Sequence, residues 1–227
     1  MIRAFTAVCI LILLGGCSSG GTSPVFKAIK GLVFSSGDEG AGAVTNGGGG
    51  LTREKITASG LALIRAQLDG EEVTNILTAT SLNEGYVTYV SAFQQTITIK
   101  GNLVTATRGL GGDLISVAEF AGDPVVNFTP PADWPSQVRR DYRFPGDGPA
   151  GIVISVTCET ARGQDSQITI VEVTYDVTKM IENCTTKDGT KFTNVYLVDK
   201  DGLVWESLQW TGPARGFINI EVLEPLT

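Results

Sequence analysis

Apolar and polar residues alternate with a period of two along most of this chain, which is typical of β-strands. From Leu61 onward, short runs rich in Val, Ile, Thr and Tyr are separated by turn-forming residues such as the Asp69-Gly70 pair. The runs cover 61–68, 72–80, 86–93, 96–99, 103–107, 137–144, 151–159, 166–180, 191–199, 203–210 and 216–225. The pattern predicts an all-β fold of about twelve strands, in which one large antiparallel meander curls into a barrel or half-barrel. A two-sheet sandwich is the alternative.

Two interruptions of this pattern stand out. Residues 121–135 contain four prolines and few periodic apolar positions, so we expect a loop that crosses between two halves of the sheet. The stretch 162–165, Arg-Gly-Gln-Asp, has the composition of a turn between two strands. Before the first strand, residues 51–56 predict one helical turn with Thr52 as its N-cap.

The first residues have the pattern of a secretory signal peptide. Arg3 precedes an apolar run over 4–14, which is too short for a permanent membrane span, and small residues follow it. The ending Leu-Gly-Gly-Cys at 14–17 also fits a bacterial lipobox, in which the cysteine is acylated and becomes the first residue after cleavage. We therefore predict a signal peptide over 1–16 and lipidation of Cys17; an ordinary signal with a chance cysteine is the alternative.

Four segments are expected after the signal peptide. Residues 17–23 form a lipidated tether, and the apolar spacing over 24–34 predicts a short amphipathic helix. Residues 35–50 are Gly-rich and almost free of large apolar groups, which predicts a disordered insertion. Residues 51–227 form a single β-rich domain.

Charge and cysteine content narrow the context. Without residues 1–16 the chain has 16 basic and 24 acidic residues, a net charge of −8, which argues against binding nucleic acid through charge. Because Cys9 leaves with the signal and Cys17 carries lipid, Cys158 and Cys184 remain, and in an oxidising compartment they form a disulfide. Two buried free thiols are the alternative.

The sequence offers little catalytic chemistry. It has no histidine, which removes the commonest general base and most zinc sites, so we expect no metal, no cofactor and no enzymatic activity. A pair of carboxylates could still cleave a glycosidic bond, although no spacing distinguishes one pair from another. The candidates are Asp113, Glu119, Asp141, Glu159, Glu172 and Glu206.

A glycine-rich stretch at 107–114, Thr-Arg-Gly-Leu-Gly-Gly-Asp-Leu, invites comparison with nucleotide-binding loops. From Gly109, the dinucleotide-binding pattern would require a third glycine at the position of Leu114, and no helix signal follows. We interpret the stretch as a tight turn in which the glycines adopt positive φ. Arg108 and Asp113 are predicted to clamp it as a local ion pair.

Aromatic and basic residues could form a surface for a ligand or partner. Trp205 and Trp210 would lie on opposite faces of a regular strand, one in the core and one directed outward, and they could join Tyr142 and Arg140. The alternatives are that the aromatic groups fill the core and that Arg140 makes a structural pair with a carboxylate.

Three segments resemble the YjbF/GfcB family of bacterial outer-membrane lipoproteins. The first is 101–116, which includes the turn; its family-like residues are Thr107, Arg108, Gly109, Leu110, Gly111, Gly112 and Asp113. The second joins 139–144 to 156–159, and the third covers 192–225. The resemblance extends from about Phe26 to Pro225.

The resemblance implies a β-rich body and an accessory role in exopolysaccharide or group-four capsule production. It carries no catalytic motif. We expect a non-catalytic protein held by Cys17 in the inner leaflet of the outer membrane and facing the periplasm. Its expected partners are other envelope proteins of polysaccharide export or the glycan itself. A half-barrel that carries a lipid or glycan ligand, and a glycan-active enzyme that uses a carboxylate pair, are the alternatives.

Overall fold

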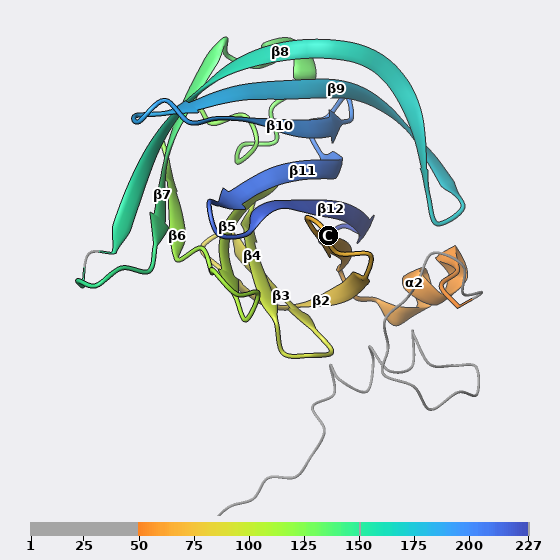
Figure 1. Cartoon of the computed structure of the whole chain (residues 1–227). Coiled ribbons are helices and arrows are strands. Elements are labelled where there is room, and N and C mark those ends of the chain that lie inside the picture. The colour runs from red at the N-terminus through yellow and green to blue at the C-terminus, as the bar shows by residue number, and fades with distance from the viewer. Residues whose placement is uncertain (1–49, 150, 227) are drawn as a thin grey trace, which may run out of the picture.

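The computed structural model describes residues 50–149 and 151–226, and its main feature is one antiparallel sheet that curls until it nearly closes into a barrel (Figure 1). The strands are β1 (Leu63–Leu68), β2 (Thr74–Asn83), β3 (Tyr86–Ser91), β4 (Thr96–Lys100), β5 (Leu103–Arg108), β6 (Ser116–Glu119), β7 (Gln137–Phe144), β8 (Ile152–Ile170), β9 (Val173–Thr186), β10 (Lys191–Val198), β11 (Val204–Gly212) and β12 (Gly216–Glu224). The prediction of an all-β, barrel-like meander of about twelve strands is confirmed. The signal peptide, Cys17, the tether, the helix over 24–34 and the insertion up to 49 lie outside the described residues.

Neighbours in the sheet are almost all neighbours in the sequence. The order is β5-β4-β3-β2-β1-β12-β11-β10-β9-β8-β7-β6, so only the β1–β12 pairing joins distant parts of the chain. The two edge strands, β5 and β6, approach each other through the turn that connects them. In this turn the Thr107 N–H donates a hydrogen bond to the Leu114 carbonyl at 2.9 Å. At the opposite end of this approach, Lys100, the last residue of β4, forms an ion pair with Glu119, the last residue of β6.

Strand β7 shows how the sequence pattern selects the inner face. Its residues alternate strictly between exposed or half-buried positions and buried ones, as expected for successive side chains on opposite faces of a sheet. Val138, Arg140, Tyr142 and Phe144 are all buried in the interior, whereas Arg139 is exposed. The same alternation that fills the interior with apolar side chains therefore carries one arginine into it.

The hairpin of β8 and β9 is longer than the strands beside it and arches over the outside of the barrel (Figure 1). It turns at Val171 and Glu172, whose φ angles are 40° and 70°. The predicted turn at 162–165 is therefore wrong: this stretch continues β8 through an irregularity in the pairing with β9. The sequence does not predict this two-residue turn, because Val-Glu lacks the Asn-Gly or Asp-Gly signal of turns with two positive φ angles.

A second apolar cluster lies outside the barrel, under the tip of this hairpin. This outer cluster consists of Ile56, Leu63, Ile76, Ile170, Val177, Trp205 and Leu223. Its first member comes from the helix α2 (Arg53–Ser59), which is capped as predicted: the Thr52 side chain accepts a hydrogen bond from the Lys55 N–H at 3.3 Å. Glu172 at the hairpin tip accepts from the Arg53 N–H at 3.2 Å, so hairpin and helix are joined directly.

Within residues 50–149 and 151–226, no helix has both the length and the apolar character needed to cross a membrane.

Candidate functional site

A buried ion cluster lies inside the barrel and is centred on Arg140 of β7. Its guanidinium binds the Asp123 carboxylate through Nε at 2.7 Å and Nη2 at 3.0 Å. It binds the Glu182 carboxylate of β9 through Nη1 at 2.7 Å and Nη2 at 2.8 Å. All three side chains are almost completely inaccessible to solvent. Two bidentate pairs thus share one guanidinium, the geometry that makes arginine the preferred cation for buried carboxylates.

The cluster has two carboxylates and one guanidinium, and neutral hydrogen-bond donors stabilise the remaining negative charge. Glu182 also accepts hydrogen bonds from the Tyr196 hydroxyl at 3.0 Å and from Asn194 Nδ2 at 3.1 Å. Asp123 accepts from the backbone N–H of Val125 at 3.0 Å. Burial and the adjacent Glu182 raise the pKa of Tyr196 well above its usual value, so its hydroxyl remains a donor. These carboxylates are surrounded by hydrogen-bond donors and shielded from solvent.

The cluster confirms one of the alternatives for Arg140, a structural pair with a carboxylate. Its partners were missed, because neither Asp123 nor Glu182 was among the candidate carboxylates. Asp123 belongs to the proline-rich segment 121–135, which joins the neighbouring strands β6 and β7, so the prediction that it crosses between two halves of the sheet is wrong. We keep the name crossing segment because it packs across the barrel against Asn102 and Gly202, and the ion pair fixes it to the sheet. A buried position in the alternating pattern of β9 is the one signal that could have identified Glu182.

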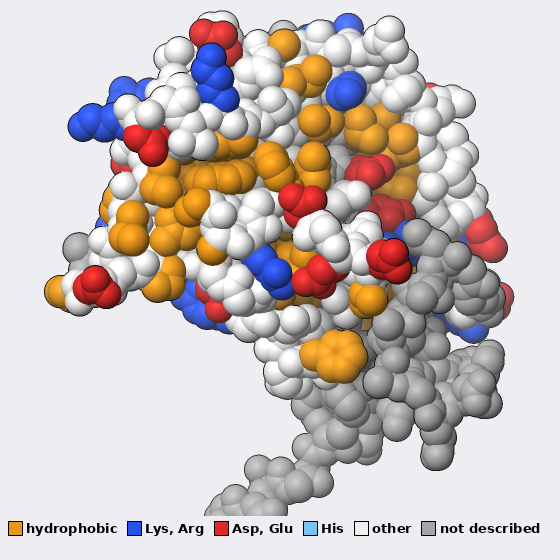
Figure 2. Space-filling model, viewed as in Figure 1, with side chains coloured by type: hydrophobic (Ala, Val, Ile, Leu, Met, Phe, Trp, Pro, Cys, Tyr) orange, Lys and Arg blue, Asp and Glu red, His pale blue; other side chains and the backbone are white. Residues whose placement is uncertain are grey.

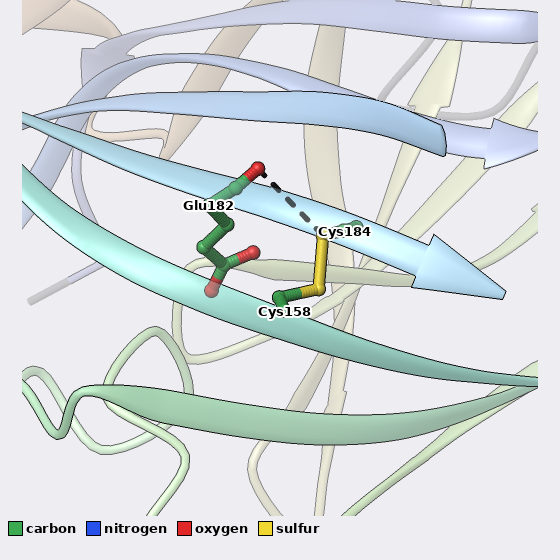
Figure 3. A group of neighbouring side chains, drawn as sticks. All are labelled: Cys158, Glu182 and Cys184. Atoms are coloured by element: carbon green, nitrogen blue, oxygen red, sulfur yellow. Dashed lines mark hydrogen bonds between the residues drawn. A yellow bond between two sulfur atoms is a disulfide. The ribbon is translucent and has the colours of Figure 1, made fainter. Parts of the chain in front are cut away.

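The disulfide between Cys158 and Cys184 lies beside this cluster, as Figure 3 shows. The two cysteines occupy directly opposite positions on β8 and β9, so the strand register brings the sulfurs together. Ligand atoms of Cys158, Glu182 and Cys184 lie within 4.8 Å of one another. Both sulfurs are used in the S–S bond, however, and Glu182 is bound to Arg140, so this trio does not offer free metal ligands.

A second polar bridge inside the barrel joins the β4–β5 turn to β11. Asn102 donates to the carbonyls of Val125 and Gly202, and its Oδ1 accepts from the Val204 N–H. Gln209 donates to the Asn102 carbonyl at 2.9 Å. These buried amides are fully engaged, and they hold the crossing segment and the curled sheet against each other.

An apolar cavity of about 260 Å³ opens among β1, β3, β4, β11 and β12. Its walls include Ile64, Val87, Ile99, Val204, Ile220 and Val222, together with Tyr89. Burial raises the pKa of Tyr89 to about 12. Within the part of the chain that the structure describes, the Tyr89 hydroxyl has no hydrogen-bond partner.

The glycine-rich turn is built as its composition predicts, except for the ion pair. Gly109, Gly111 and Gly112 have φ angles of 78°, 75° and 84°. Asp113 accepts from the N–H groups of Gly109 at 2.9 Å and Leu110 at 3.0 Å, and from the Thr107 hydroxyl. Arg108 donates instead to backbone carbonyls, including that of Leu114 at 2.8 Å, so the predicted Arg108–Asp113 pair is wrong. Arg108 therefore binds carbonyl groups of the turn and Asp113 binds N–H groups of the turn, instead of binding each other.

The predicted ligand or partner surface does not form, because all four of its residues are buried. Trp205, Trp210, Tyr142 and Arg140 are exposed by 8%, 7%, 1% and 0%. Trp205 and Trp210 do lie in different clusters, on opposite sides of the sheet. The side expected to face solvent is covered by the β8–β9 hairpin, where Tyr175 stacks on Trp205 at 3.6 Å between ring centroids. Trp210 stacks on Phe192 inside, at 4.4 Å.

The face of the molecule drawn in Figure 2 has apolar regions and no region in which charges of one sign gather. Figure 2 shows hydrophobic side chains gathered in a band over β11 and the strands beside it, with acidic and basic side chains distributed around them. This face therefore offers no basic patch for an anionic polymer.

One of the candidate carboxylates has a close acidic neighbour. Glu206 of β11 lies directly opposite Glu221 of β12. Burial, and then the Glu206 charge, raise the pKa of Glu221 against the opposing effect of Arg65, which binds it at 2.7 Å. The pair lies on the outer face of the sheet, alongside Leu63 and Trp205 rather than in the interior. The structure brings together none of the other candidate acids as a cross-strand pair among its described residues.

The chain is similar to known proteins in both sequence pattern and fold. The family model described as group 4 capsule polysaccharide lipoprotein gfcB, YjbF, matches residues 33–223. No curated protein sequence matches the chain. The crystal structure of the hypothetical lipoprotein YmcC from Escherichia coli (K12) is similar, with a TM-score of 0.67 and 15% sequence identity, covering 78% of this chain and 90% of that one. At this identity the likeness shows a common fold.

Proposed function

Because the chain belongs to the YjbF family of group 4 capsule polysaccharide lipoproteins, we propose that it is a non-catalytic accessory protein of capsule or exopolysaccharide production. The family is one of lipoproteins associated with capsule polysaccharide, so the chain is a lipid-anchored protein of the cell envelope. The observation that carries the proposal is the extent of the match, which begins before α2 and ends within β12.

The proposed anchor is the acylated Cys17 in the inner leaflet of the outer membrane, with the β-rich body facing the periplasm. Two or three acyl chains, each contributing about 0.8 kcal/mol per buried CH₂, would make this attachment effectively permanent. Ser18 follows the cysteine, where an aspartate would resemble an inner-membrane retention signal. The body would then contact polysaccharide-export proteins of the envelope or the glycan.

The geometry of the acidic residues supports a non-catalytic role. Asp123 and Glu182, the most deeply buried acids described above, are held by Arg140 and by neutral donors. Glu206 and Glu221 lie on the outer face of the sheet and are engaged by Asn219 and Arg65. A glycosidase needs two carboxylates that flank a substrate in a cleft, and neither pair has that arrangement.

The proposal is tested by deleting the gene and measuring secreted polysaccharide under conditions that induce its production. We expect a clear loss that the wild-type gene restores. Normal secretion from the deletion strain would contradict the proposed role.

The anchor gives a separate prediction. Cys17→Ser removes the acylated thiol, so the protein should move from the membrane fraction to the soluble fraction and lose metabolic labelling by a fatty-acid probe. Cys9→Ser, within the predicted signal peptide, is the matched control and should leave both properties unchanged. A Cys17→Ser protein that stays in the membrane would show that Cys17 is not the anchor.

A further inference from the structure

The cavity among β1, β3, β4, β11 and β12 has the chemistry of a binding site for a hydrocarbon chain. Aliphatic side chains from these five strands, together with Leu82 of β2, line it. Its polar lining residues Asn102 and Ser207 already have hydrogen-bond partners. We propose that it binds one uncharged alkyl or acyl chain of about ten carbon atoms, whose oxygen function accepts a hydrogen bond from Tyr89.

The size of the cavity limits the ligand. An apolar cavity of about 150 Å³ accommodates benzene, which has six carbon atoms. In proportion, the 260 Å³ found here corresponds to roughly ten. The space is therefore large enough for one chain and too small for the paired chains of a phospholipid.

Tyr89 determines which polar group the ligand needs. This side chain is 6% exposed, it lines the cavity, and its hydroxyl has no partner among the described residues. Burial raises its pKa to about 12, so it keeps its proton at physiological pH and can donate to an ester carbonyl, an amide carbonyl or an alcohol oxygen. None of the described residues that line the cavity is a lysine or arginine, so an ionised carboxylate buried there would lack a counter-charge.

The rim of the cavity is apolar as well. Leu82 on the β2–β3 hairpin, Phe128 on the crossing segment and Leu226 near the C-terminus line it, although they are 62%, 45% and 47% exposed. Phe128 is also held at a φ of 50°, a conformation uncommon for an aromatic residue. Three large apolar side chains from separate segments thus meet at one opening, where a chain passing from solvent into the cavity would contact them.

Binding is tested by calorimetric titration with 1-decanol of the exported Cys17→Ser protein, prepared without detergent. We expect saturable binding to one site, and at least ten-fold weaker binding of decanoate at pH 7. Membrane release of this variant is scored separately by fractionation, so a failed anchor and an empty cavity give different results. No saturable binding up to the solubility limit of decanol, or equal binding of decanoate, would overturn the proposal.

Substitutions locate the site. Val87→Phe fills the cavity and should abolish decanol binding, whereas Val73→Phe makes the same change at a position 36% exposed outside the lining and should not alter it. Tyr89→Phe should weaken decanol binding roughly three- to ten-fold, the effect of one hydrogen bond. Circular dichroism of each variant confirms the fold. Unchanged binding by a folded Val87→Phe protein would overturn the assignment.

The bound hydrocarbon chain could come from a separate lipid or from the acyl chains of the protein's own anchor. Cells fed a diazirine fatty acid are irradiated, and the cross-linked peptides of the protein are mapped. Cross-links to cavity peptides in both wild type and Cys17→Ser identify a separate lipid, and cross-links in wild type alone identify the anchor. Cross-links to cavity peptides in neither protein would contradict the proposal.

Discussion

Arg140 places a fixed positive charge inside the barrel, between carboxylates from two distant parts of the chain. Because all three side chains are inaccessible to water, the charges depend on one another rather than on solvent. Such a cluster adds little stability relative to an apolar core, but the loss of one member leaves the others buried and unpaired. The cluster therefore makes the interior intolerant of single substitutions.

Replacement of Arg140 by leucine should lower the free energy of unfolding by about 3–5 kcal/mol, since two buried carboxylates lose their counter-charge. The matched control is Arg139→Leu, the same change at the adjacent, exposed position, which should cost less than about 1 kcal/mol. Urea denaturation at pH 7 measures both. Equal losses for the two variants would show that the cluster is not energetically coupled.

Buried tyrosines give the protein a characteristic sensitivity to alkali. The pKa of Tyr89 is about 12 in the folded chain against 10.0 for a free tyrosine, because burial disfavours the phenolate. The associated stability is complete below pH 10 and is lost as the pH rises to 12, by about 2–3 kcal/mol for two pKa units. Tyr89→Phe should reduce the fall in unfolding free energy over this range by that amount, and the half-buried Tyr86→Phe serves as control. The same fall in both variants would contradict this.

At the scale of elements, the β8–β9 hairpin contributes structure on both sides of the sheet. Its base carries Glu182 and the disulfide into the interior, and its tip covers the outer cluster. Trp205 holds the tip by stacking on Tyr175, and its own indole is fixed by a hydrogen bond from Nε1 to Asp199 of the β10–β11 turn at 3.0 Å. The tip should therefore open locally when this contact is lost, while the interior remains intact.

Trp205→Ala is expected to speed hydrogen exchange over 168–177 and in α2, without an effect on β7. Leu208→Ala, at a more exposed position of the same strand, is the control and should leave these rates unchanged. Faster exchange spread evenly over the barrel would show that the outer cluster is part of one cooperative unit with the interior.

Local patterns explain which elements could be predicted from the sequence. The alternation in 137–144 identified β7 with its exact bounds, and Thr52 identified the start of α2. The hairpin turn was misplaced because Val171 and Glu172 adopt positive φ without the residues that favour it. The partners of Arg140 were not predicted, because Asp123 comes from a connecting segment and Glu182 from a strand two places along the sheet, and only the three-dimensional fold brings them together.

At the scale of the whole molecule, the barrel is held closed by contacts of the crossing segment and the glycine-rich turn. At Gly202 the backbone packs so closely on this segment that a Cβ would lie 1.9 Å from the Phe128 carbonyl oxygen. Asp113 organises the turn between the two edge strands by accepting from two N–H groups and one hydroxyl. The approach of β5 and β6 therefore depends on a few specific residues rather than on a ladder of strand pairing.

Asp113→Ala should destabilise the protein by about 1–3 kcal/mol, because the donors of the turn lose their acceptor. The loss should be accompanied by faster exchange of the Thr107 and Ile115 amides. Asp147→Ala removes a carboxylate from an exposed loop and serves as control. Unfolding curves and exchange rates that match between the two variants would show that Asp113 does not maintain the closure.

The pairing of β1 with β12 has a consequence for how the protein is made. The first strand of the sheet hydrogen-bonds to the last one, and every other pairing joins strands adjacent in the sequence. During synthesis or passage through a translocation pore, hairpins can form as each strand emerges, but β1 waits with an open edge until the C-terminus is released. Such an interval leaves an exposed edge open to intermolecular pairing. Chains stalled shortly before β12 should therefore be the most prone to aggregate and the most dependent on chaperones.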